Sequence, residues 1–558
     1  MAEQLTYDKP FNTDGRKMTT RPDLQGDRAA PPLVTRTDDD PAVLADAAVD
    51  DYALHVVPPT WRLGRTKLAV AWSATLAALF WVVIAAIGAS IVGTKQALIG
   101  MAVALVVYSI ISYPIQKAAA DTGSTLATFS RSIFGSIGVP IASLIFVISA
   151  TVLAIFEGSV LAVAFHTHFG GSIYVWYGAV AMFCTLITLG GVRVWLEKLN
   201  AWLLPVFLTG LFGALVWALA EYGYQAEWIN AGAPDPSAFF GPGWLHVFAL
   251  YLTGMVNVLY IFDFARMGRA KDVRHNGHVT FGAVYWILAI MVVGGIGIYL
   301  SQAIPVDGVN EVGVVTGIVQ LMGIWGVIYI FATQAKIQTA NMYLSSLNLQ
   351  IFASRTVKLT LSRSVWTFVI GVILFAIMSA DVFSFLTELL AYQGVLAIAW
   401  VAVALVHIIY RREGTPQQRF EIRPGRVPRV NPGGLGGWAA GSLAGIIVLA
   451  TGSMFSLTYA LIITYLVSTV VYGGSLLMAK PGWFTMDRPF DPAQELAVDP
   501  WNIHIQCHHC NKSYVAVEMD RDPNRNHEAI CSSCAGGHEF QKAARAESQQ
   551  YEARAHRA

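Results

Sequence analysis

Charge is what this sequence has least of. Only 13% of its 558 residues are Asp, Glu, Lys or Arg, whereas soluble domains carry about 25%. Hydrophobic residues make up 55%, and the mean hydropathy is +0.52. The net charge of +1 leaves no basic surplus to attract nucleic acid, so a nucleic-acid partner is excluded. These proportions predict an integral membrane protein that lies in a lipid bilayer.

Catalytic motifs and cysteines are scarce as well. The sequence has no nucleophile–base set and no phosphate-binding Gly-rich loop, which argues against an enzyme and against an ATP-driven pump. Of five cysteines, Cys184 stands alone in apolar sequence, where a small core residue is expected. The polar start Met-Ala-Glu-Gln lacks the apolar core of a signal peptide.

The apolar residues form twelve runs, most of about 20 residues, the length at which a helix spans a bilayer. The runs are 68–92, 96–116, 139–165, 173–192, 199–220, 244–264, 279–301, 317–350, 365–380, 388–410, 435–453 and 457–478. They predict an all-α membrane protein with twelve transmembrane helices. A protein of this kind with polar residues in its spans is usually a transporter, and a structural or signalling membrane protein is the alternative.

Lysine and arginine are nearly missing from every second loop. If the N-terminus is cytoplasmic, the inner loops hold 17 of these residues and the outer loops hold Lys95 alone. The longest outer loop, 221–243, has none. By the positive-inside rule, this asymmetry predicts a multi-pass protein of the cytoplasmic membrane with both termini in the cytoplasm.

Polar sequence flanks the apolar runs. Residues 1–60 are rich in Asp, Pro and Ala and predict a mostly disordered cytoplasmic tail. A transporter domain over 61–480 follows. A linker, 481–500, leads to a small module at 501–540 and a polar tail at 541–558.

The small module holds the other four cysteines as two CxxC pairs separated by 20 residues. This spacing predicts a structural, zinc-ribbon-like site, because too little apolar sequence is present for the module to fold without metal. The expected ligands are Cys507, Cys510, Cys531 and Cys534. Disulfides are the alternative, disfavoured because cytoplasm is reducing. Substitute ligands are His504, His508, His509 and His527. Regulation, or docking of a cytoplasmic protein partner, is the role we expect.

Two charged residues lie inside apolar runs. Glu157 is in the third run and Lys336 in the eighth. A charge within lipid costs a few kcal/mol or more unless it is paired or faces water, so such residues mark a solute or ion pathway. We expect Glu157 and Lys336 to be counter-charges, either as a structural ion pair or as a pair whose opening couples protons to transport.

Polar side chains within the eighth run fall on two faces of the expected helix. At 100° per residue, Gln334, Gln338, Asn341 and Ser345 share one stripe, and Lys336 lies on roughly the opposite side. Amides donate and accept hydrogen bonds, which suits a planar heterocyclic solute. Holding helices together is the alternative role of the stripe.

The sixth run has features of a broken helix and a gate. Gly254 precedes Met255 at its middle and predicts a break where backbone groups face a solute. Asp263 and Arg266 end the run and form a gate or a structural ion pair. The first run has neither Gly nor Pro between Leu68 and Ile87, so the partner break expected there is not visible in the sequence. Candidates for stacking on a ring are Trp72, Phe80, Trp81, Phe156 and Tyr260.

Three motifs carry a resemblance to a known family. They are Arg131–Gly138 (RSIFGSIG), Asp263–Arg266 (DFAR) and Asn341–Leu347 (NMYLSSL), each at the edge of, or within, the expected span. Over residues 50 to 480 the chain resembles the nucleobase–cation symporters, also called purine–cytosine permeases.

The resemblance implies a LeuT-type fold: a five-plus-five inverted repeat followed by two helices, working by alternating access. It also implies a solute site near the midplane between spans 1, 3, 6 and 8. Asn341 matches the asparagine that the eighth span of the family offers to a flat nitrogen heterocycle. Glu157 is the nearest match to the amide that the third span of the family supplies. Gly254 and Met255 fall where the sixth span of the family often has an aromatic residue.

The chain departs from the family at the cation site. Sodium-coupled relatives use small oxygen ligands on the eighth span, four to six residues before the asparagine, where this chain has Ala335-Lys336-Ile337. The ammonium of Lys336 would fill that space, so we expect no sodium there. Proton coupling through Glu157 and Lys336, or uniport, is predicted instead.

The function expected from these features is secondary active transport of a nucleobase-like compound such as a purine, cytosine, allantoin or hydantoin. The alternative is a receptor of transporter fold that signals solute occupancy through its zinc tail.

Overall fold

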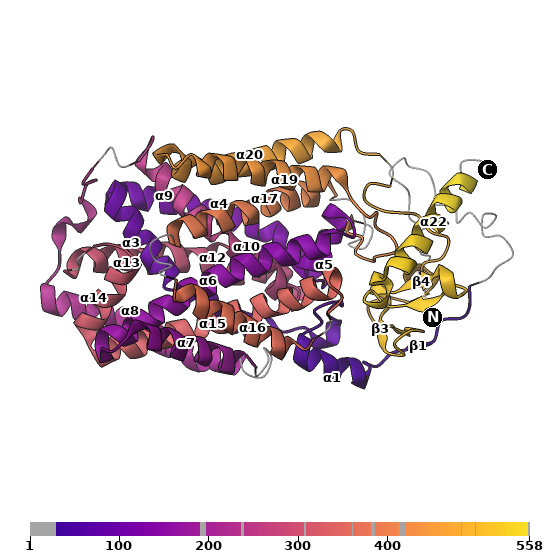
Figure 1. Cartoon of the computed structure of the whole chain (residues 1–558), viewed down its shortest axis with the longest axis horizontal. Coiled ribbons are helices and arrows are strands. Elements are labelled where there is room, and N and C mark those ends of the chain that lie inside the picture. Colours follow the sequence, from indigo (N-terminus) through magenta and orange to yellow (C-terminus); the bar gives the residue numbers. More distant parts are fainter. Residues whose placement is uncertain are drawn as a thin grey trace, which may run out of the picture.

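The computed structural model describes residues 30–189, 197–235, 239–305, 308–359, 361–380, 386–411, 419–480, 482–496 and 498–555. Helices lie side by side in an elongated bundle, and a small module with strands covers one end of it (Figure 1). We call this end of the bundle the tail side. The disorder expected for residues 1–29 lies outside the described residues.

Each of the twelve apolar runs is helical where it is described. The first span is the pair α2 (Arg65–Leu76) and α3 (Phe80–Val92), and the sixth combines α9 (Gly243–Leu252) with α10 (Val256–Ala265). The seventh runs from Val273 to Ala303 as α11, α12 and α13 joined by π-helical turns. The other spans are α4 (Thr94–Thr122), α6 (Gly138–Phe169), α7 (Ile173–Leu189), α8 (Glu197–Tyr222), α15 (Ile324–Thr356), α16 (Arg363–Met378), α17 (Leu386–Tyr410), α19 (Pro432–Ala450) and α20 (Met454–Leu476).

The helices differ in how well they suit a membrane. Eight described helical segments are long and apolar enough to cross one, and the bent α2–α3 pair makes a ninth. α7 and α16 are shorter apolar helices. α15 has 33 residues, but its amides and lysine lower its hydropathy. The expected run 317–350 is wrong at its start, because Gly323, at φ 57°, separates α14 (Glu311–Met322) from α15.

Two spans are broken near their middles. In the sixth, the 3-10 turn Thr253–Met255 confirms the expected break, and Nε2 of Gln393 donates to the Thr253 carbonyl at 2.7 Å. In the first, α2 and α3 meet at 43°. There the indole Nε1 of Trp81 donates to the Thr75 carbonyl at 2.9 Å. The partner break that no Gly or Pro marks in the sequence is therefore present, because a side chain can satisfy a freed carbonyl without either residue.

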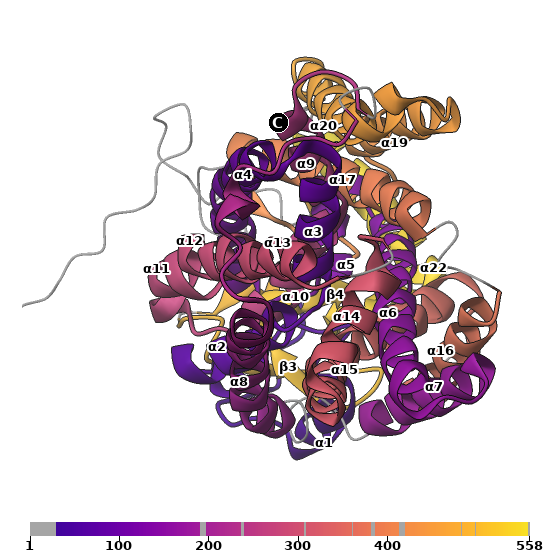
Figure 2. The same ribbon diagram turned by 90° about the vertical axis from the view of Figure 1, so that its left-hand side faces the viewer.

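The last two spans pair tightly with each other at the edge of the bundle (Figure 2). A Cβ at Gly441 of α19 would lie 1.9 Å from Oγ of Ser468 of α20, so glycine is needed for this close approach. The two helices lie away from the centre, where α6 packs along α15.

The segment before the first span is ordered in its described part, contrary to the disorder expected for residues 1–60. β1 (Thr35–Arg36) pairs antiparallel with β2 (His504–Gln506), and α1 (Pro41–Asp50) is capped by the Asp40 carboxylate. Tyr52 and Val57 are buried. Order comes from burial against the tail and the helices, which composition alone does not reveal.

The tail forms a small module at the same end of the bundle as the N-terminal segment (Figure 1). β2 pairs with β3 (Ser513–Val515), and β4 (Asp520–Asp522) pairs with β5 (Glu528–Ile530). The region expected to be a polar tail begins within α22 (His538–Ala555), which packs on the strands by way of buried Phe540 and Ala544.

Candidate functional site

The four amide and carboxyl side chains expected at the solute site lie between α6 and α15, beside the two breaks. Glu157, Gln334, Gln338 and Asn341 are at most 1% exposed. Residues buried to this degree must normally satisfy their polar atoms within the protein. These side chains do so only in part.

Glu157 faces the break in the first span. Its carboxyl lies next to the Gln334 amide and to the backbone N–H groups of Leu79 and Phe80. Leu79 and Phe80 begin α3, and a helix N-terminus favours negative charge because its first N–H groups lack partners. The second carboxyl oxygen, Oε2, has no partner among the described residues.

Gln338 bridges α15 and α6 with one end of its amide. Its Nε2 donates to the carbonyl of Ala154 at 2.8 Å. A Cβ at Gly158 would lie 2.9 Å from this nitrogen, so the glycine makes room for the amide. The other end, Oε1, is buried without a partner in the described part of the chain.

Asn341 is oriented by a tyrosine of the sixth span. The hydroxyl of Tyr260 donates to its Oδ1 at 2.9 Å, which leaves Nδ2 as a buried donor with no described partner. Tyr260 stacks on Phe146 of α6, with ring centroids 5.3 Å apart. Tyr260 was expected only as a candidate for stacking on a ring, and its hydroxyl has this second role.

Unpartnered donors and acceptors therefore gather at one place. They are Oε2 of Glu157, both amide atoms of Gln334, Oε1 of Gln338 and Nδ2 of Asn341. A buried polar atom left unpaired costs about 1–3 kcal/mol. A polar ligand could satisfy such a set, and all five atoms come from residues of the predicted stripe and from its neighbour on α6.

Aromatic and apolar side chains flank this polar set. Phe80, the first residue of α3, contacts Phe156 edge-on at 6.2 Å between centroids. A Cβ at Gly254 would lie 3.0 Å from the Phe80 ring, so the break in the sixth span packs against the break in the first. Met255 is fully buried beside it. The structure thus brings Phe156, Gly254 and Phe80 together.

Lys336 faces a different neighbour. Its Nζ donates to Oγ of Ser73 on α2 at 3.3 Å, on the side of α15 away from the amide stripe. Glu157 lies with Gln334, about 200° around the helix from Lys336. The pairing of Glu157 with Lys336 stays a prediction.

Asp263 and Arg266 lie at the tail-side end of α10. Their side chains are 3.8 Å apart, and the Asp263 carboxylate also accepts from the Leu126 backbone N–H at 2.9 Å. Arg266 donates to the carbonyl of Asp51 at 2.9 Å. The sequence did not point to Asp51 or to its partner Tyr343, because segments so far apart in sequence meet only in the fold.

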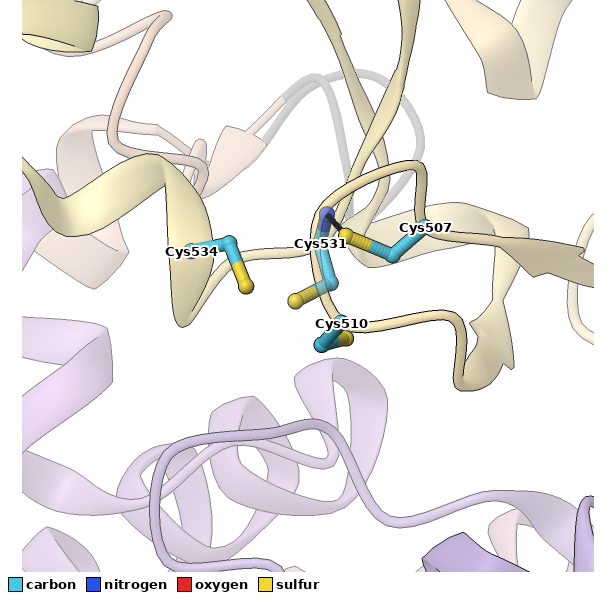
Figure 3. A group of neighbouring side chains, drawn as sticks. All are labelled: Cys507, Cys510, Cys531 and Cys534. Carbon is cyan, nitrogen blue, oxygen red and sulfur yellow. Dashed lines mark hydrogen bonds between the residues drawn. The ribbon is translucent and has the colours of Figure 1, made fainter.

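The four tail cysteines form one cluster. Their Sγ atoms lie within 4.8 Å of one another and converge on one point (Figure 3). Four sulfurs bound to a tetrahedral zinc would be about 3.8 Å apart, so the group fits a metal ion. All four are free thiols in this structure, which favours a metal site over the disulfide alternative. The substitute histidines His504, His508 and His527 pair instead with Asp39, Asp522 and Glu547.

Comparisons with known proteins rest on structure. No protein-family model matches the sequence, and no match was found among curated proteins. The chain is similar to Mhp1, a nucleobase-cation-symport-1 family transporter, in a closed conformation with bromovinylhydantoin bound. The TM-score is 0.61 at 15% identity, over 76% of this chain and 95% of that one.

Two further structures agree. The inward-facing conformation of Mhp1 has a TM-score of 0.57 at 14% identity, over 81% of this chain and 96% of that one. The substrate-bound outward-open state of a Na+-coupled sialic acid symporter has a TM-score of 0.54 at 14% identity. The match covers 80% of this chain and 94% of that one. At these identities the likeness shows the fold, and it confirms the predicted LeuT-type membrane fold. All three are transporters, as expected for a chain predicted not to be an enzyme.

Proposed function

We propose that this chain is a secondary transporter of the nucleobase–cation symporter family, which moves a planar nitrogen heterocycle by alternating access. The observation that carries the proposal is a set of five polar atoms between α6 and α15, beside the two broken spans, that have no partner among the described residues. Carboxylate and amide oxygens accept hydrogen bonds, and Nδ2 of Asn341 donates one. A ring with adjacent N–H and C=O groups, as in purines, cytosine, allantoin and hydantoins, complements this pattern.

In this proposal, transport is coupled to protons or proceeds as uniport without a coupling ion. Lys336 lies between α15 and α2 and brings a positive charge into the place where the family resemblance puts sodium. Glu157 is the group of the solute site that can bind a proton. The proposed orientation has the tail side in the cytoplasm, which the loop lysines and arginines favour.

We propose zinc as the metal of the tail cysteines. Four thiolates at two CxxC knuckles are the donor set that zinc takes in structural sites, and no fifth donor faces the cluster among the described residues. The metal would hold the two knuckles together, each of which is too small to bury a core of its own.

Two measurements test transport. A thermal-shift screen of purified protein against nucleobases, allantoin and hydantoins should find a compound that raises the melting temperature. The same compound, radiolabelled, should enter proteoliposomes that contain the protein. Binding without uptake would favour the receptor of transporter fold, and neither binding nor uptake of any ring compound would refute the substrate class.

A further inference from the structure

Residues 35–57, which we call the strap, run between the tail-side ends of the helices and the cysteine module. On the helix side, Tyr343 of α15 donates its hydroxyl to the Asp51 carboxylate at 3.0 Å. Arg266 of α10 donates to the carbonyls of Asp51, at 2.9 Å, and Tyr52, at 3.4 Å. The strap thus contacts the tail-side end of α10, which carries Tyr260, and the side of α15 two residues beyond Asn341.

The strap is held there in a conformation that it would not adopt alone. Asp51 and Tyr52 have φ angles of 50° and 57°, in the left-handed region that costs an ordinary residue about 1–2 kcal/mol. Such geometry persists when the surroundings determine it. Two further hydrogen bonds supply this support. The Thr125 hydroxyl donates to the Ala53 carbonyl, and the Val57 N–H donates to the Gly123 carbonyl.

The opposite face of the strap is bound by the module. One carboxylate, Glu518, uses both of its oxygens: Oε2 accepts from the Val56 N–H at 2.8 Å, and Oε1 lies 2.9 Å from Nδ1 of His55. Glu518 is 1% exposed. The His55 ring stacks on Tyr514 of β3, with centroids 4.0 Å apart and planes 7° apart.

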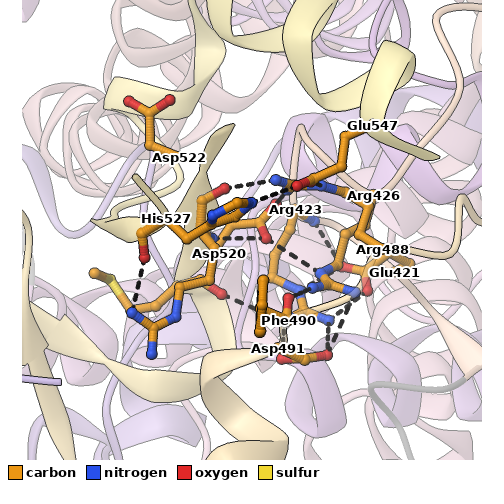
Figure 4. Close-up of polar contacts among 12 residues, drawn as sticks. Glu421, Arg423, Arg426, Arg488, Phe490, Asp491, Asp520, Asp522, His527 and Glu547 are labelled. Atoms are coloured by element: carbon orange, nitrogen blue, oxygen red, sulfur yellow. Dashed lines mark hydrogen bonds and ion pairs between the residues drawn. The ribbon is translucent and has the colours of Figure 1, made fainter. Parts of the chain in front are cut away.

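The module is itself anchored to the membrane domain by a buried ion network (Figure 4). Arg423, in the loop between α17 and α19, pairs with Asp491 of the tail at 2.7 Å. Arg426 of the same loop pairs with Asp520, which also pairs with Arg488 at 2.7 Å. A module fixed in this way can hold the strap in place, which a freely hanging tail could not.

The metal site contacts the helix of the solute site. The guanidinium of Arg355, in the last turn of α15, faces Cys531 and Cys534 and lies directly against Gly536. Arg131 of α5 (Leu126–Phe134) donates to Oγ of Ser532 in the same knuckle at 3.0 Å. Four thiolates around a divalent ion carry a net charge of −2, which attracts Arg355.

From these contacts we infer that the metal-bound module is a latch, which holds the strap across the tail-side gate of the proposed transporter. The inference rests on the proposed transport function. Opening towards the tail side requires α10 and α15 to move apart from the strap, and the strap is tied to both helices and to Glu518. Loss of the metal frees the two knuckles, releases the strap and shifts the protein towards the tail-side-open state.

Hydrogen exchange of the full-length protein in nanodiscs tests the latch without any substrate, so failure of the transport proposal leaves the test intact. Metal-loaded protein is compared with protein stripped by a chelator, which reaches the sulfurs through a cavity of about 230 Å³ lined by Cys510, Cys531 and Cys534. We expect amides 53–57, and those of α10 and α15 near Arg266 and Tyr343, to exchange about tenfold faster after stripping.

A variant separates the latch from general unfolding of the tail. Glu518→Gln keeps the shape of the side chain and removes the charge that binds His55, so exchange at 53–57 should again rise about tenfold, with unchanged metal content. Glu547→Gln is the matched control, because both partners of Glu547, Arg488 and His527, belong to the tail. Two results would overturn the latch. One is that Glu547→Gln accelerates exchange at 53–57 as much as Glu518→Gln does. The other is that neither metal stripping nor Glu518→Gln changes this exchange by more than twofold.

Discussion

The hydroxyl of Tyr260 donates to Oδ1 of Asn341 across the gap between the sixth and eighth spans. Because the amide oxygen is occupied, the amide nitrogen is the end of Asn341 that remains for a ligand. The bond also ties the broken helix to the helix of the amide stripe. A ligand acceptor at this position would therefore be recognised by a donor whose direction is fixed in advance.

We expect Asn341→Ala to weaken binding of the transported compound by about 10- to 100-fold, since one directed hydrogen bond is lost and Tyr260 is left unpaired. Calorimetry or thermal shift of purified protein measures the change. The control is Asn348→Ala on the same helix, because the Asn348 amide donates to the Leu344 carbonyl of its own helix. If both variants bind equally well, Asn341 is not a ligand residue.

Tyr260→Phe should have a smaller effect of the same sign. Without the hydroxyl the Asn341 amide can turn over, so binding should weaken by roughly threefold to tenfold while the variant retains the stack on Phe146. Tighter binding in Tyr260→Phe would show that the amide does not donate to the ligand.

Glu157→Gln is predicted to flatten the dependence of uptake on pH. The amide cannot exchange a proton, yet it retains the shape and the hydrogen-bonding capacity of the side chain. Uptake into proteoliposomes, with and without a pH gradient, measures this. A variant that accumulates solute with an unchanged response to the gradient would remove Glu157 from the coupling scheme.

Lys336→Ser should change the coupling ion. Removing the ammonium beside Ser73 opens space between α15 and α2 and leaves small oxygen groups there. We expect uptake to lose its pH dependence or to become stimulated by sodium. Uptake and pH dependence both equal to those of the unchanged protein would refute the idea that Lys336 replaces a cation.

The sequence predicted the spans, the polar stripe and the cysteine cluster because each depends on a local pattern. Hydropathy locates a span in the sequence, and helical periodicity places Gln334 and Asn341 on one face. The CxxC spacing identifies which cysteines lie together. Gly254 marked the break in the sixth span for the same reason, since glycine weakens a helix wherever it stands.

Other features depend on contacts between distant segments and left no local trace. The break between α2 and α3 is sustained by the Trp81 indole and by Glu157 of another helix. Glu157 of α6 lies beside Gln334, whereas Lys336 lies on the other side of α15 and donates to Ser73 of α2. The strap has the composition of a disordered tail, and it is ordered by Glu518, more than 450 residues later.

Replacing Cys510 or Cys531 by Ser should remove the metal from the tail. Elemental analysis of the full-length protein is expected to find one zinc per chain, and each single variant should retain well under half of it, because three thiolates leave the tetrahedral site incomplete. Cys184→Ser is the control, since this residue is buried in α7 away from the tail. An unchanged metal content in the tail variants would show that the cluster is not the metal site.

Docking of the strap should depend on pH through Asp51. Burial raises the pKa of its carboxyl to about 6 from an ordinary value of 3.8, although Arg266, Arg363 and the Tyr343 hydroxyl act in the opposite direction and Asp50 adds to the rise. The docked strap therefore binds a proton more tightly than the released one. Docking is strongest at low pH and weakens as the pH rises through 6.

Between about pH 5 and about pH 7.5 this difference amounts to roughly tenfold in the docking equilibrium. Protection factors of amides 53–57 in metal-loaded protein, corrected for the intrinsic pH dependence of exchange, should fall by that factor. Asp51→Asn cannot ionise and should keep the same protection at both values. A fall of equal size in Asp51→Asn would show that Asp51 is not the source of the dependence.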